Sequence, residues 1–84
     1  MITPIATLHG SGRENLSFDL SEAHRAVSVA FELTKRAHPH PRDYADIEHW
    51  RLASREADER LKKLQDVRND LFELLQHVMS ESVE

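Results

Sequence analysis

The sequence predicts a mainly α-helical protein: an antiparallel hairpin of two helices with a short N-terminal β-strand, assembled as a homo-oligomeric helical bundle. Three observations predict this fold class. Apolar residues recur in alternating steps of three and four from Trp50 to Val78, with no Gly or Pro between them. A shorter segment from Leu20 to Leu33 is apolar on more than one side. Pro39 and Pro41 separate the two segments and are expected to stop the first helix.

The 84 residues are expected to form a single domain. Its predicted parts are a head of strand and turn at 1–18, a first helix at 19–38, a connection at 39–44, a long second helix at 45–80 and a tail at 81–84. A domain of this size buries only roughly 60 to 65% of the surface that its unfolded chain exposes. We therefore expect a partner subunit to contribute to its stability.

The head is predicted to contain one strand at Ile5 to His9, followed by a turn at Gly10-Ser11-Gly12. A lone strand needs a neighbour, and the sequence offers no second strand, so we expect it to pair with the same strand of another subunit. Asp19 with Glu22 three residues later resembles a capping box and is expected to start the first helix.

The second helix is predicted to begin between Asp43 and Asp46, with Asp43 as its cap, and to continue to about Ser80. It would be roughly twice as long as the first, so its C-terminal half is expected to overhang an antiparallel hairpin. We expect this overhang to form the oligomer interface, through Leu64, Val67, Leu71, Leu74 and Val78.

The alternating steps of three and four that begin Trp50, Ala53, Ala57 define an apolar seam along the second helix. Arg60 is the one charged residue in this seam. An unpaired guanidinium costs several kcal/mol to bury, so its head must either reach water or meet an anionic group. A hairpin hinged near residue 41 would place Arg60 opposite residues 21–25, where Glu22, His24 and Arg25 are its expected neighbours.

Composition disfavours several classes of function. The formal charge of −4 and the aromatic content of 6% disfavour nucleic acid as a partner, and there is no cysteine to hold a disulfide or zinc. The N-terminal residues resemble neither a signal nor a membrane span, so a cytoplasmic location is expected. The six histidines, including His38 and His40, match no metal motif. We expect no metal, no cofactor and no enzymatic activity.

Two segments are candidates for binding an anion. Gly10-Ser11-Gly12-Arg13 is either a phosphate cradle or a plain turn, and Arg42 with Tyr44 either presents a cation and an aromatic ring or closes the hairpin. The candidate ligand-binding residues are Arg60, Arg42, Tyr44, Arg13, His9, His24 and Arg25.

Three stretches carry a resemblance: Thr7-Leu8-His9-Gly10-Ser11-Gly12-Arg13, Pro39-His40-Pro41-Arg42-Asp43-Tyr44, and Glu56-Ala57-Asp58-Glu59-Arg60. They resemble a group of small, mostly uncharacterised phage and prophage proteins with an N-terminal strand, a Gly-Ser turn and a Pro-x-x-Arg-Asp-Tyr connection. Ala57 stands where that group usually has histidine. The resemblance implies a small phage accessory protein in the host cytoplasm. By analogy of size and build, it suggests a protein that sequesters host immune signalling nucleotides.

Three hypotheses follow from these patterns. The first is a homo-oligomeric protein that binds a small anionic ligand, such as a signalling nucleotide, between its subunits. The second is a protein–protein interaction module that inhibits or adapts a host protein. The third is a purely structural oligomer in which Arg60 forms a salt bridge with Glu22 or Glu56.

Overall fold

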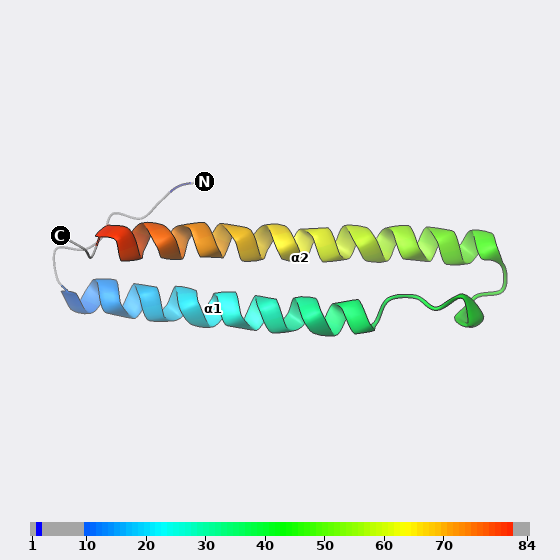
Figure 1. The fold of residues 1–84 in the computed structure, drawn as a ribbon, viewed down its shortest axis with the longest axis horizontal. Coiled ribbons are helices and arrows are strands. Elements are labelled where there is room, and N and C mark those ends of the chain that lie inside the picture. Colours follow the sequence, from blue (N-terminus) through cyan, green and yellow to red (C-terminus); the bar gives the residue numbers. More distant parts are fainter. Residues whose placement is uncertain (1, 3–9, 82–84) are drawn as a thin grey trace.

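A computed structural model describes Ile2 and residues 10–81 of the chain, with side chains for Ile2 and residues 14–80. This part contains two long α-helices, α1 (Gly10–Arg36) and α2 (Ile47–Glu81), and between them a short 3-10 helix, η1 (Pro41–Asp43). The helices lie antiparallel and side by side in a molecule with extents of 59 × 20 × 14 Å (Figure 1). The predicted mainly α hairpin is confirmed. The predicted strand at Ile5 to His9 lies outside the described residues.

The first helix begins earlier than the sequence predicted. α1 includes Gly10, Ser11 and Gly12, so the prediction of a turn there and of a helix start at Asp19 is wrong. Glycine costs about 1 kcal/mol in a helix interior through backbone entropy, but it is among the residues tolerated at a helix N-terminus. The longer α1 also packs against α2, with Leu16 and Leu20 half-buried.

This extension removes the predicted overhang of the C-terminal half of α2. Figure 1 shows α1 running alongside that half, while the first turns of α2 lie beside the connection. Val78, predicted to lie in an oligomer interface, is fully buried within the chain at 0% exposure. Leu64 and Leu71 are half-buried in the same hairpin.

α2 faces α1 through two rows of residues, each with a spacing of seven. One of these two rows differs from the prediction. Both seams share Trp50, Ala57, Leu64, Leu71 and Val78. The second line of the observed seam is half-buried and consists of Ser54, Leu61, Arg68 and Leu75. The predicted line, Ala53, Arg60, Val67 and Leu74, lies beside the seam, and Arg60 is exposed. The prediction that Arg60 belongs to the hairpin seam is therefore wrong.

The hairpin buries very little of its apolar surface. Among the described residues, the buried apolar side chains are Ala57, at 4% exposure, and Val78. Ser54 Oγ is also buried and has no hydrogen-bond partner among the described residues. Two packed helices cannot enclose a core, so most apolar side chains of this hairpin remain half-exposed.

The connection is fixed to α2 by specific polar contacts. Asp46, rather than the predicted Asp43, caps α2: its Oδ1 accepts a hydrogen bond of 2.8 Å from the backbone N–H of His49. Trp50 Nε1 donates to the carbonyl oxygen of Pro39 at 3.2 Å. His38 Nε2 lies 3.2 Å from Asp58 Oδ1. The cap at Asp46 marks the start of α2, and the other two contacts hold residues 38–39 against that helix.

The cap at Asp46 should make stability depend on pH. The backbone hydrogen bond from His49 lowers the pKa of Asp46 below its usual value. Because the pKa of Asp46 is lower in the folded state, its carboxylate stabilises the fold at pH values above its pKa in the unfolded chain. This stabilisation is lost as the pH falls through its pKa in the folded state. We expect Asp46→Ala to lower the melting temperature at pH 7 and to approach the wild-type value below about pH 4. A difference independent of pH, measured by circular dichroism melts, would contradict the assignment.

Candidate interaction surface

The contacts between the helices define the register of the hairpin. The ring of His24 lies 5.6 Å from that of Phe72, with an interplanar angle of 42°. The guanidinium carbon of Arg68 lies 4.6 Å from the centre of the Phe31 ring. Together with the contact between His38 and Asp58, these pairs place Arg60 opposite approximately residue 37.

Arg60 therefore does not lie opposite residues 21–25, as the sequence had predicted. The error has a clear cause: residues 37–46 belong to the connection, so the turn between the helices is wider than a hinge at residue 41 allows. Glu22 is paired instead with Arg25 on its own helix, at 2.9 Å. This hydrogen bond from Arg25 lowers the pKa of Glu22.

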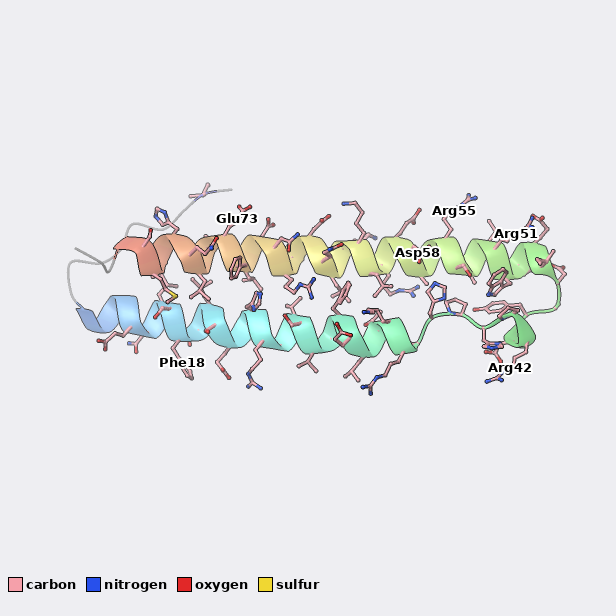
Figure 2. The ribbon with its side chains drawn as sticks, viewed as in Figure 1. Phe18, Arg42, Arg51, Arg55, Asp58 and Glu73 are labelled. Atoms are coloured by element: carbon pink, nitrogen blue, oxygen red, sulfur yellow. The ribbon has the colours of Figure 1, made fainter. Side chains whose placement is uncertain are left out.

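The structure does not bring the predicted ligand-binding residues together within one chain. His24 packs on Phe72, Arg25 pairs with Glu22, and Arg60 lies about 18 Å farther along the hairpin than His24, given a rise of 1.5 Å per residue. Arg42 and Tyr44 lie in the connection, and Figure 2 shows Arg42 at that end of the molecule. His9 and the side chain of Arg13 lie outside the described part.

The arginine in the observed seam is Arg68, which sequence reasoning had missed. It is half-buried, and its guanidinium lies over the Phe31 ring in a cation–π contact. Its signal in the sequence was the row Ser54, Leu61, Arg68 and Leu75, which lies next to the row of Trp50 and Ala57 on the side away from Arg60.

The two sides of the hairpin differ in character. His24 and Phe72 meet on one side of the seam, where the neighbouring positions are polar and include Ser28, Lys35, Asp58 and Gln65. On each helix, the residues on the other side of the seam from His24 or Phe72 lie on the opposite side of the hairpin, as helical geometry requires. We call this side the second apolar face, and its residues are Ala23, Ala26, Ala30, Leu33, Ala53, Arg60, Val67 and Leu74.

The second apolar face is largely uncovered in the single chain. Leu33 is 53% exposed and Val67 is 47% exposed, and Ala23, Ala30 and Leu74 are half-buried. Arg60 is exposed among these residues and makes no ion pair with any described residue. Phe18 is also exposed, on the outer side of α1, where it points away from α2 (Figure 2). Of the predicted interface residues, Val67 and Leu74 thus remain available to another molecule.

The described residues contain no group of three His, Cys, Asp or Glu side chains able to hold a metal ion. Within the same part of the chain, neither helix is long and apolar enough to cross a membrane. The chain matches no protein-family model, and no curated protein or solved structure is significantly similar to it.

The position of Arg68 in the seam can be tested by mutation. We expect Arg68→Ala to reduce the free energy of unfolding by about 1 kcal/mol, because both the cation–π contact and the packing of the aliphatic stem are lost. Arg55→Ala is the matched control, since Arg55 points away from α1 (Figure 2). Equal stabilities of the two variants in chemical denaturation would show that Arg68 does not contribute to the seam.

Proposed function

We propose that this protein acts by association rather than by catalysis, as a self-associating helical-hairpin module of the phage accessory type in the host cytoplasm. One observation carries the proposal: the hairpin leaves a second apolar face exposed along both of its helices. An uncovered apolar surface of this kind favours contact with another protein. The scattering of the candidate ligand residues along the hairpin favours association over a ligand pocket within one chain.

Sedimentation tests this proposal. At micromolar concentration the wild-type chain should sediment with at least twice the 9.7 kDa mass of one chain. Val67→Asp should release single hairpins, because association would then bury an unpaired carboxylate. Leu52→Asp is the control, since Leu52 is 54% exposed but lies outside the second apolar face. A wild-type chain that sediments as a monomer throughout the concentration range would refute the proposal.

Binding of a small anion between subunits, such as a host immune signalling nucleotide, is a second candidate function. It is favoured by the exposed guanidinium of Arg60, which has no carboxylate partner among the described residues. A phosphate at this position would gain a charge-assisted hydrogen bond.

Equilibrium dialysis with cyclic di-AMP tests this second candidate. We expect retention by the wild-type oligomer, and a loss of about 2 to 4 kcal/mol of binding free energy in Arg60→Met. Arg55→Met provides the control at an arginine outside the second apolar face. No retention by the wild type, or equal retention by both variants, would remove cyclic di-AMP as the ligand of Arg60.

A further inference from the structure

We infer that the occupant of the second apolar face is a second copy of the chain, turned end for end, so that two hairpins form a four-helix bundle about a twofold axis. In this arrangement α1 packs antiparallel on the α1 of the second copy, and α2 packs on the second copy's α2. The inference rests on the proposed self-association and specifies its geometry.

Heptad spacing supports the bundle. On α2, Ala53, Arg60, Val67 and Leu74 are each separated by seven residues and lie beside the seam. On α1, Leu16, Ala23 and Ala30 have the same spacing, and Ala37 continues it at the first residue of the connection. Helices that carry three apolar residues per heptad are typical of bundles, where each helix has two neighbours, whereas the hairpin supplies one neighbour. The alanines would allow the two α1 helices to approach closely.

The residues on the two helices specify the same axis. On α2, an antiparallel pairing centred on Val67 places Val67 beside its own copy and Arg60 beside Leu74 of the second copy. On α1, a pairing centred on Ala30 places Ala23 beside Ala37 of the second copy. The contacts between His24 and Phe72 and between Phe31 and Arg68 place Ala30 almost level with Val67 in the hairpin. One twofold axis can therefore pass through both centres.

Charge complementarity supports the end-for-end orientation. Lys63 and Asp70 make no ion pair with described residues. The pairing centred near Val67 places Lys63 beside Asp70 of the second copy, and Asp70 beside Lys63 of the second copy.

The face is large enough for a stable dimer. α1 has 27 residues, and the second largest extent of the molecule is 20 Å. At 1.5 Å per residue, these dimensions give the hairpin an outline of about 800 Å², which is comparable with the area that each partner buries in a standard specific interface.

Cysteine cross-linking at the axis tests the geometry. The chain has no natural cysteine, so Val67→Cys introduces a single thiol. We expect a short bis-maleimide to convert more than half of Val67→Cys to covalent dimer, and Leu52→Cys to give at least tenfold less, since this residue lies far from the axis. Hairpins aligned at the same end would place α1 over α2, with the two Val67 residues diagonally apart, and would give little cross-linking.

A charge exchange tests the orientation independently. Lys63→Glu and Asp70→Lys should each raise the dimer dissociation constant about tenfold at low salt, because each converts two symmetry-related attractions into repulsions. The double variant should return to within about threefold of the wild type. Arg55→Glu combined with Glu73→Lys is the matched control, since both side chains point away from α1 (Figure 2).

The outcomes separate this inference from the proposed function. If the wild type is a monomer by sedimentation, both fail. If it is an oligomer but Val67→Cys does not cross-link, or the double charge variant does not recover affinity, self-association stands and the end-for-end bundle is wrong. Circular dichroism of every variant establishes that the hairpin is still helical.

Discussion

The line Trp50, Ala57, Leu64, Leu71 and Val78 on α2 is the contact on which the rest of the structure depends. Trp50 at its start contacts the connection, and its later residues lie beside α1. Among the described residues, this line contains both buried apolar side chains, Ala57 and Val78. Two helices can bury a line of residues but not a three-dimensional core. The radius of gyration of 18.2 Å, against about 12 Å for a compact chain of this length, expresses the same constraint. The uncovered lines on both helices are its consequence.

The polar contacts of the connection determine which residues meet along that line. Asp46 fixes the first turn of α2 through His49, and Trp50 holds the carbonyl of Pro39. Because the connection occupies residues 37–46, the partner of each α2 residue on α1 is shifted toward the connection. Arg68 thereby meets Phe31, and Arg60 lies near the end of α1.

The sequence could predict two helices, their antiparallel order and the apolar character of both. It could not select the heptad line that faces α1, because Ala53, Arg60, Val67 and Leu74 are about as apolar as Ser54, Leu61, Arg68 and Leu75. That choice depends on packing between residues far apart in the chain, such as His24 with Phe72 and Phe31 with Arg68. The start of α1 at Gly10 was also hidden, since glycine propensity favours a turn and only the packing of α1 on α2 favours the helix. The prediction that the helix at Leu20 to Leu33 needs two neighbours rested on periodicity alone, and the exposed Leu33 and Val29 are consistent with it.

Small-angle X-ray scattering of the wild-type chain measures the central claim most directly, because it reports mass and shape together. The end-for-end bundle predicts a particle of about twice the 9.7 kDa chain mass whose helical body is no longer than the 59 Å extent of one hairpin. A particle with the mass of one chain would contradict the account. So would a dimer about twice as long as one hairpin, since the second apolar face would then remain uncovered.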